Sequence, residues 1–248
     1  FRKIFRYVTM FIKPENFKAE CTFVKKLSKK VLEFGFKVQD HQFEFMAGQF
    51  VMINFDSLID EQKNLSRAYS ISSAPAENYF ELCVEIVPGG QAGAYFSAMK
   101  QGDIVDFKGP FGVCSIKPEN TNDLLMVATG TGIAPIKSIL ADLAARGDTR
   151  QVDVYFGLRF EEDIFYETEV RELVSKFPNS KFVLTLSKPS ANWSGDKGRV
   201  TEYIIGKGFR ENLDIYLCGN GNMIRDIRSE AIVEGVPKKQ IHVEIFDS

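Results

Sequence analysis

The sequence predicts two domains, an antiparallel β-barrel followed by an α/β domain built on a parallel sheet. Short strands separated by turns occupy residues 18–116, a pattern typical of a small barrel. Strands alternate with helices over residues 123–248, which is typical of a parallel sheet covered on both faces. Residues 117–122 are polar and rich in turn formers, so they mark the boundary. Residues 1–17 are expected to form an N-terminal extension with apolar residues at helical spacing.

The composition is that of a soluble globular protein, with 44% hydrophobic and 26% charged residues in 248. No apolar run approaches the ~18 residues that a membrane span requires. The four cysteines are far apart and form no C-x-x-C pair, which argues against an iron–sulfur cluster and against a disulfide framework. No metal site is expected, and a reducing, cytoplasmic setting is the default expectation.

The most informative segment of the barrel region is Arg67-Ala68-Tyr69-Ser70. Strand alternation places Arg67 and Tyr69 on one face and Ser70 on the other. A guanidinium offers donors suited to a pyrophosphate, a tyrosine ring can lie flat on a flavin, and a serine hydroxyl can bond its polar edge. The segment therefore indicates a flavin site, although these residues alone fit an ordinary strand equally well.

A glycine-rich turn, Pro88–Gly93, leads into a short helix expected over Ala94–Met99. The first backbone N–H groups of a helix that follows such a turn can bind a phosphate without any side chain. This turn is therefore a second candidate contact for a dinucleotide.

The α/β region begins with an expected buried strand, Asp123–Ala128, and continues into a glycine loop and a helix that ends at Gly147. Gly130 and Gly132 would let the backbone approach a pyrophosphate at the helix N-terminus, where the helix dipole favours anions. A tight structural turn is the alternative for this loop alone. Further strands are expected over 152–156, 181–186 and 214–217, and helices near 167–176, 200–205 and 222–234.

Five segments resemble motifs of the ferredoxin–NADP reductase family, in the same order and at similar spacing. They are Arg67-Ala68-Tyr69-Ser70, Gly109-Pro110-Phe111-Gly112, Gly130–Pro135, Leu217–Met223 and Val243-Glu244-Ile245-Phe246. The resemblance covers roughly residues 18–248. It implies a FAD-containing NAD(P)H reductase that passes electrons to a one-electron carrier, either ferredoxin or flavodoxin.

The resemblance also implies roles for individual residues. Ser70 would lie near flavin N5, Cys218 beside the nicotinamide, and Glu244 would complete a polar network, so these three are the expected catalytic residues. The expected FAD-binding residues are Arg67, Ala68, Tyr69, Ser70, Cys83, Val84, Glu85, Gly90, Gln91, Ala92, Gly93, Thr131 and Phe246. The expected NAD(P)-binding residues are Gly130, Thr131, Gly132, Arg159, Ser187, Lys188, Lys197, Arg199, Cys218, Gly219, Asn220 and Met223.

Two positions depart from the family pattern. Gly93 stands where Ser or Thr is common, which removes one hydrogen bond to the pyrophosphate but keeps the backbone donors, so FAD is expected rather than FMN. Phe246 matches the terminal aromatic residue that shields the flavin, but Asp247 and Ser248 follow it here. An ordinary core residue is therefore an open alternative for Phe246. In the same way, Cys218 could be a small buried hydrophobic residue without a role at the nicotinamide.

NADPH is the expected nucleotide, with NADH left open. Ser187-Lys188 stands where NADPH-using members carry Ser-Arg, and Lys188, Lys197 and Arg199 could all face a 2′-phosphate. No acidic residue stands ready to accept a ribose 2′-hydroxyl. Against this, NADH-using members can also carry Ser here, and lysine is a weaker phosphate ligand than arginine.

The charge distribution suggests a partner. Residues 1–30 hold nine Lys or Arg and two Glu, in a chain whose net charge is −2. Such a basic segment could dock an acidic redox carrier, although a solvated face is the commoner alternative. Nucleic-acid binding is not expected, because the chain is acidic overall and has no binding motif. Two other functions stay open: the reductase subunit or module of a larger oxygenase or hydrogenase system, and a nucleotide-binding module without redox activity.

Overall fold

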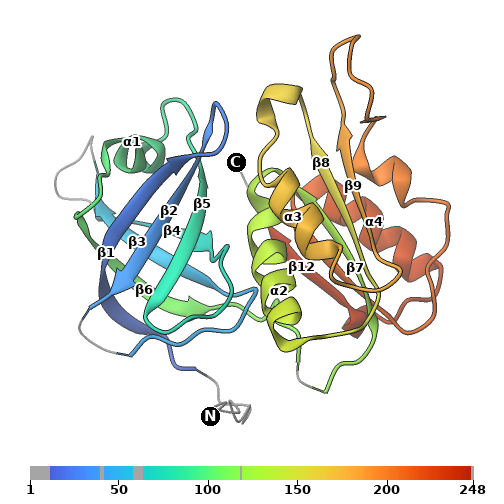
Figure 1. Ribbon diagram of the computed structural model, residues 1–248, viewed down its shortest axis with the longest axis horizontal. Coiled ribbons are helices and arrows are strands. Elements are labelled where there is room, and N and C mark those ends of the chain that lie inside the picture. Colours follow the sequence, from blue (N-terminus) through green and yellow to red (C-terminus); the bar gives the residue numbers. More distant parts are fainter. Residues whose placement is uncertain (1–11, 40–41, 58–63, 118, 247–248) are drawn as a thin grey trace.

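Two β-sheet domains lie side by side in the computed structural model, which describes residues 12–39, 42–57, 64–117 and 119–246 (Figure 1). The first domain is a six-stranded antiparallel sheet and the second a six-stranded parallel sheet flanked by helices. This confirms the predicted fold class. Most of the helical spacing expected over residues 1–17 lies outside the described residues. Within the described residues, no helix is both long enough and apolar enough to span a membrane.

The first sheet has the strand order β4-β3-β6-β1-β2-β5. Its strands are β1 (Glu15–Lys26), β2 (Val31–Val38), β3 (Phe50–Asp56), β4 (Asn64–Ser70), β5 (Tyr79–Glu85) and β6 (Ile104–Phe111), with helix α1 (Gln91–Ala98) between the last two. Ile71, directly after β4, forms a β-bridge with Leu82 of β5, and the Ser72 N–H donates to the Glu81 carbonyl at 2.8 Å. The two edge strands therefore meet, and the sheet curves into a barrel.

Packed phenylalanine rings fill the barrel. Phe36, Phe80 and Phe107 are almost fully buried, and their ring centroids lie 4.9 to 5.4 Å apart. Aromatic pairs at this separation add to the free energy gained by burial. The core holds β4 and β5, which carry the candidate flavin residues, in fixed positions.

The second sheet has the strand order β10-β9-β8-β7-β11-β12. Its strands are β7 (Asp123–Thr129), β8 (Val152–Leu158), β9 (Lys181–Leu186), β10 (Asp196–Lys197), β11 (Leu213–Gly219) and β12 (Ile241–Ile245). Helices α2 (Ile133–Arg146) and α3 (Glu167–Val174) pack on one face, and α4 (Gly221–Val233) packs on the other. The chain reverses its direction of strand addition between β7 and β11, and such a switch point is where open α/β sheets bind ligands.

Several expected elements differ in extent from those observed. Helix α1 begins at Gln91 rather than Ala94, because Gly90 takes the extended N-cap conformation and accepts the first helical hydrogen bond from Ala94. The helix expected near 200–205 is a single 3₁₀ turn, Val200–Tyr203. Strand β1 begins at Glu15, within the expected extension, because residues 15–20 pair with β6.

Candidate functional site

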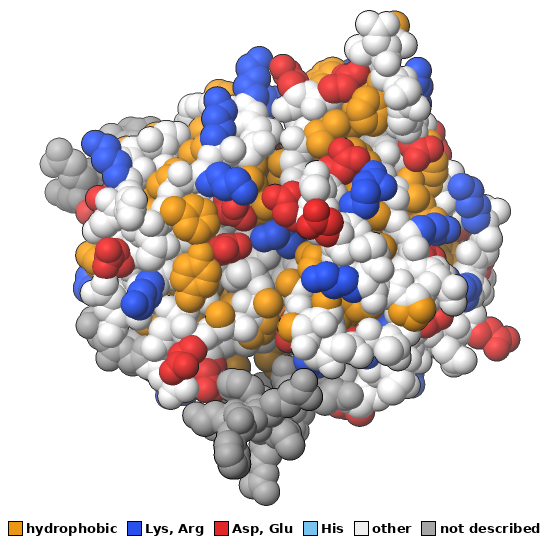
Figure 2. All heavy atoms as spheres, in the orientation of Figure 1, with side chains coloured by type: hydrophobic (Ala, Val, Ile, Leu, Met, Phe, Trp, Pro, Cys, Tyr) orange, Lys and Arg blue, Asp and Glu red, His pale blue; other side chains and the backbone are white. Residues whose placement is uncertain are grey.

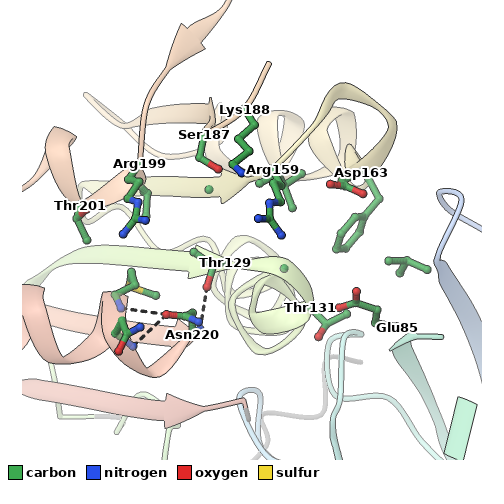
Figure 3. Close-up of a pocket in the computed structure, with 18 of the residues that line it drawn as sticks. Glu85, Thr129, Thr131, Arg159, Asp163, Ser187, Lys188, Arg199, Thr201 and Asn220 are labelled. Atoms are coloured by element: carbon green, nitrogen blue, oxygen red, sulfur yellow. Dashed lines mark hydrogen bonds between the residues drawn. The ribbon is translucent and has the colours of Figure 1, made fainter. Parts of the chain in front are cut away.

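A cavity of about 600 Å³ lies at the carboxyl ends of the parallel strands (Figure 3). Its lining includes these predicted residues: Glu85, Gly130, Thr131, Arg159, Ser187, Lys188, Arg199, Asn220 and Met223. In Figure 3, Arg199, Lys188 and Arg159 lie along one side, and Thr131 and Asn220 along the other. The cavity is large enough for a nucleotide, and these three cations line one side of it.

The glycine loop after β7 forms one wall of the cavity. Gly130 has φ +54°, a left-handed conformation that favours glycine, and a Cβ at this position would meet no atom within 4 Å. Gly132 is buried and does not line the cavity. A Cβ there would lie 2.3 Å from the Cys218 carbonyl oxygen, so only glycine lets the loop pack against β11. The structural-turn alternative therefore describes Gly132, whereas Gly130 is open to a ligand.

Two helices begin at this edge of the sheet, and they differ in their caps. The Asn220 side chain caps α4 by accepting hydrogen bonds from the N–H groups of Asn222 and Met223. No side chain caps α2. A 3₁₀ turn, Gly130–Gly132, leads into α2 without a side-chain cap, and two of its residues line the cavity. Its backbone N–H groups are therefore the better candidates for binding a phosphate, because the Ile133 N–H already bonds back to this turn and Pro135 has no N–H.

Lys197, Cys218 and Gly219, three further predicted NAD(P)-binding residues, do not line the cavity. Lys197 is exposed on β10, where its carbonyl accepts a hydrogen bond from the Tyr203 hydroxyl. Cys218 and Gly219 are buried in β11, directly before the cavity residue Asn220.

The cavity also contains residues that no sequence motif indicates. Asp163 and Phe165 follow β8, Asp226 comes from α4, and Lys30 comes from the hairpin between β1 and β2. Lys30 belongs to the first domain, so both domains contribute to the cavity. The sequence indicated no acidic residue that could accept a hydrogen bond from a ribose 2′-hydroxyl, and Asp226 is such a residue in the cavity lining.

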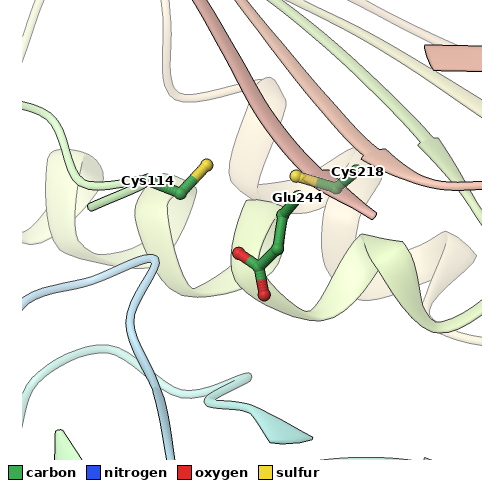
Figure 4. A group of neighbouring side chains, drawn as sticks. All are labelled: Cys114, Cys218 and Glu244. Carbon is green, nitrogen blue, oxygen red and sulfur yellow. The ribbon is translucent and has the colours of Figure 1, made fainter. Parts of the chain in front are cut away.

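The predicted catalytic residues, Ser70, Cys218 and Glu244, meet where the two domains touch. Figure 4 shows two of them, Cys218 and Glu244. The Ser70 hydroxyl donates a hydrogen bond to Glu244 Oε1. Cys218 and Glu244 are paired neighbours on β11 and β12. The thiol of Cys114, which was not predicted, points toward that of Cys218, and both sulfur atoms lie within 4.8 Å of a Glu244 oxygen.

The protonation of this group follows from its burial. Burial raises the pKa of Glu244, and the Ser70 hydrogen bond lowers it by a smaller amount. The hydrogen bond with Cys114, followed by burial, raises the pKa of Cys218 well above its ordinary value. Cys218 is therefore a neutral thiol near pH 7, suited to orienting a ligand rather than to nucleophilic attack.

The predicted flavin residues lie on β4, on β5 and at the start of α1. Arg67 is exposed, with its guanidinium on the Ser66 carbonyl at 2.9 Å. Tyr69 is half-buried, its ring 4.9 Å from that of Phe96, and burial raises its pKa to about 12. The neighbouring Ala68 is exposed, Cys83 and Val84 are buried, and Glu85 is exposed at the end of β5.

The turn before α1 accommodates the departure at Gly93. A Cβ at Gly93 would lie 3.0 Å from the Val87 carbonyl oxygen, so the Ser or Thr common in the family would be crowded here. No side chain caps α1 at Gly90, and Gln91 and Ala92 form its first turn. The site thus offers the contacts that a flavin dinucleotide needs: an exposed guanidinium and an uncapped helix start for the pyrophosphate, and an aromatic ring and a hydroxyl for the flavin.

Phe246 follows β12, and its N–H donates to the Gly219 carbonyl at 2.9 Å. Its partly buried ring packs against a cluster of buried hydrophobic residues to which both domains contribute. This packing leaves the flavin-shielding role a prediction, beside the open alternative of a core residue.

Comparisons with known proteins establish the family. Residues 18–116 match the model for the oxidoreductase FAD-binding domain, and residues 126–229 match the oxidoreductase NAD-binding domain. Ferredoxin–NADP reductase B of Sorangium cellulosum is 34% identical over 246 residues, covering 95% of this chain and 100% of that protein. The chain belongs to the ferredoxin–NADP reductase family. The resemblance inferred from the motifs is thus confirmed.

Two further similarities extend this result. The structure of a ferredoxin–NADP⁺ reductase from Neisseria gonorrhoeae with bound FAD and NADP matches with a TM-score of 0.78 and 26% identity, covering 93% of this chain and 98% of that one. Reductase component 1 of the terephthalate 1,2-dioxygenase of a Comamonas species is 29% identical over 82% of this chain, which spans 60% of that protein. This family member is an NAD(P)H-dependent flavin oxidoreductase that binds FAD and a nicotinamide nucleotide.

Proposed function

We propose that this protein passes electrons from NADPH, through FAD, to a separate one-electron carrier, ferredoxin or flavodoxin. The observation that carries the proposal is the junction of Ser70, Glu244 and Cys218 beside the end of the nucleotide cavity. FAD supplies the chemistry, because it accepts a hydride from the nicotinamide and releases the two electrons singly.

The protein's own groups have distinct tasks in this proposal. Arg67 and the start of α1 bind the pyrophosphate of FAD. The Cys218 thiol orients the nicotinamide, and Glu244 holds a proton close to the Ser70 hydroxyl. The contact between the two domains excludes water from this group, since Cys218 is fully buried.

Arg159, Lys188 and Arg199 support NADPH as the nucleotide, because they can pair with phosphate charges. Asp226 supports NADH, because a carboxylate accepts hydrogen bonds from a ribose 2′-hydroxyl and repels a 2′-phosphate. The lining holds four cations, Lys30 being the fourth, and three carboxylates, since Glu85 and Asp163 line it as well as Asp226. The three cations that lie together along one side favour NADPH.

The carrier is proposed to dock through lysines of the N-terminal region. Some of these lysines are already paired: Lys25 with Glu33 and Glu169, Lys29 with Glu162, and Lys18 with Asp106. Basic and acidic side chains are interspersed on the face shown in Figure 2, so no broad patch of one sign marks a docking site there. Lys26, for which the described residues provide no ion pair, is the better candidate.

A second candidate function is the reductase component of an oxygenase system. The similarity to the terephthalate dioxygenase reductase component favours it, although this chain spans 60% of that protein. The chemistry at the flavin would be the same, and the electron acceptor would differ. A cytoplasmic setting stays a prediction in either case.

Purified protein tests the central claim. It should be yellow, release FAD on denaturation and lose its flavin absorbance when NADPH is added without oxygen. Ferredoxin, flavodoxin and oxygenase components, offered in turn with a dye as control, would then identify the acceptor. A colourless protein that takes up neither FAD nor FMN would contradict the proposal.

A further inference from the structure

Helix α2 is bonded directly to the chain segment that follows the flavin motif. Lys137 Nζ donates to the Ser72 carbonyl at 3.3 Å, and the fully buried Ser138 hydroxyl donates to the Ser73 carbonyl at 2.6 Å. These carbonyls belong to the second and third residues after Ser70. Two adjacent side chains of α2 thus hold the backbone that carries the Ser70 hydroxyl.

The start of the same helix is fixed to the strand that carries Cys218. Gly132, the N-cap of α2, packs so closely on the carbonyl of Cys218 that a Cβ would overlap it. Lys137 lies five residues further along, about 7.5 Å at the helical rise of 1.5 Å per residue. Helix α2 therefore acts as a spacer of fixed length between the backbone at Cys218 and the backbone after Ser70.

A buried ionic group holds the helix against the first domain. Lys137 Nζ lies 3.6 Å from Glu33 Oε1, 3.3 Å from Glu81 Oε2 and 4.5 Å from the centroid of the Tyr166 ring. The Tyr166 hydroxyl donates to Glu33 Oε1. The Lys137 and Glu33 side chains are only 14% and 7% exposed. Glu33 faces Cys83 in the pairing of β2 with β5, so the group lies beside the strand expected to contact the flavin.

Buried ion pairs contribute little net stability, because losing water costs the two charges about as much as they gain from one another. Their clearest use is to specify one arrangement over its alternatives. Here the arrangement specified is that of the two domains, because Glu33 and Glu81 belong to the first and Lys137 and Tyr166 to the second.

We propose that Lys137, Ser138 and Tyr166 are positioning residues that set the spacing between Cys218 and Ser70 through helix α2, and thereby the rate of flavin reduction. This inference rests on the proposed function, since it concerns the distance between nicotinamide and flavin. A displacement of about 1 Å in reacting groups can cost about a hundredfold in rate. The residues act through the backbone of the site and contact neither ring.

Tyr166→Phe is the most conservative test, because it removes only the hydroxyl that bonds Glu33. Ser138→Ala and Lys137→Met remove the other two contacts, and Lys137→Arg retains the charge. The matched control is Arg210→Met, which removes the cation beside Asp153, a carboxylate 9% exposed, within the second domain alone. For each variant, stopped-flow absorbance gives the limiting rate of flavin reduction and the Kd for NADPH, and FAD content and Tm are measured alongside.

Tyr166→Phe, Ser138→Ala and Lys137→Met are expected to lower the limiting rate about tenfold or more, with full FAD content and little change in Kd. Lys137→Arg should recover part of the rate, and Arg210→Met should lower Tm without slowing reduction. Variants with a lower Tm but the wild-type limiting rate of flavin reduction would overturn the inference, because the contacts would then only hold the domains together. If Lys137→Met does not fold, Tyr166→Phe and Ser138→Ala still decide the result. Wild-type protein that neither NADPH nor NADH reduces would overturn the proposed function as well.

Discussion

The Ser70 hydroxyl donates a hydrogen bond to the Glu244 carboxylate across 174 residues of sequence. The bond joins β4 of the first sheet to β12, an edge strand of the second. On β12, Glu244 is also the paired neighbour of Cys218. One carboxylate therefore connects the predicted flavin residue to the predicted nicotinamide residue, and it does so in a largely buried setting that raises its pKa.

Glu244→Gln should change how stability depends on pH. Because the folded-state pKa of Glu244 is raised, its proton is bound more tightly in the folded protein than in the unfolded chain. This tighter proton binding stabilises the folded protein fully at a pH below the pKa of Glu244 in the unfolded chain. The stabilisation is lost as pH rises through the raised pKa of the folded state. Glutamine stays neutral, so the Tm of Glu244→Gln should increase relative to the Tm of wild type as pH rises through this range. A Tm difference that stays constant with pH would show that Glu244 is not held protonated by its surroundings.

Cys218→Ala should slow flavin reduction about two- to tenfold, the value of one lost neutral hydrogen bond, and should leave FAD bound. Stopped-flow reduction and FAD content measure the two effects. Cys21→Ala is the control, because Cys21 is equally buried but lies in the barrel core. Loss of FAD from Cys218→Ala, or a wild-type rate with unchanged nucleotide affinity, would rule out an orienting role.

Lys188→Ala should distinguish between the nucleotides. A charge-assisted hydrogen bond to a 2′-phosphate is worth about 1.5–3 kcal/mol, so kcat/KM for NADPH should fall roughly tenfold to a hundredfold. The value for NADH should hardly change. Lys197→Ala offers a matched comparison, because Lys197 is a nearby exposed lysine that does not line the cavity. A wild-type preference for NADH would reverse the assignment and turn attention to Asp226.

Lys26→Glu should slow reduction of an acidic carrier severalfold at low salt and leave reduction of a small dye unchanged, since charge mainly affects the encounter rate. Steady-state assays over a salt series measure this, and the difference should vanish at high salt. Lys29→Glu is expected to behave differently, because Lys29 lies 3.4 Å from Glu162 of the second domain. Its reversal should disturb flavin reduction with either acceptor. If Lys26→Glu changes neither assay at any salt, this face does not dock the carrier.

Local patterns were sufficient to predict the elements that carry the site. Ile136, Ile139, Leu140 and Leu143 recur at helical spacing in the sequence and are all buried in α2. Gly147, the predicted end of this helix, takes the left-handed conformation. Such features depend on residues within one or two helical turns, so the sequence shows them directly. Each predicted catalytic residue could be identified because it belongs to a motif with its own local signal, whereas the sheet order and the contact between the domains bring the three together.

The contacts between segments remote in sequence could not be predicted in this way. Cys114 lies beside Cys218, and Lys137 beside Glu33, only because the sheet order and the docking of the domains bring them together. Lys30 carries no motif and reaches the cavity because the β1–β2 hairpin extends to it. These residues have ordinary local surroundings, and their partners are set by tertiary structure alone.

The parallel pairing of β11 with β12 makes the alignment of two strands a condition for chemistry. Cys218 of β11 is paired with Glu244 of β12, and Val243 and Ile245 occupy the neighbouring paired positions. Slippage of β12 by a single residue would keep the backbone hydrogen bonds but present an aliphatic side chain to the thiol, and Ser70 would lose its acceptor. A misaligned molecule of this kind could retain its secondary structure and its bound cofactor and still be inactive. Activity per bound flavin is therefore a more sensitive measure of correct folding in this protein than its colour or its circular dichroism.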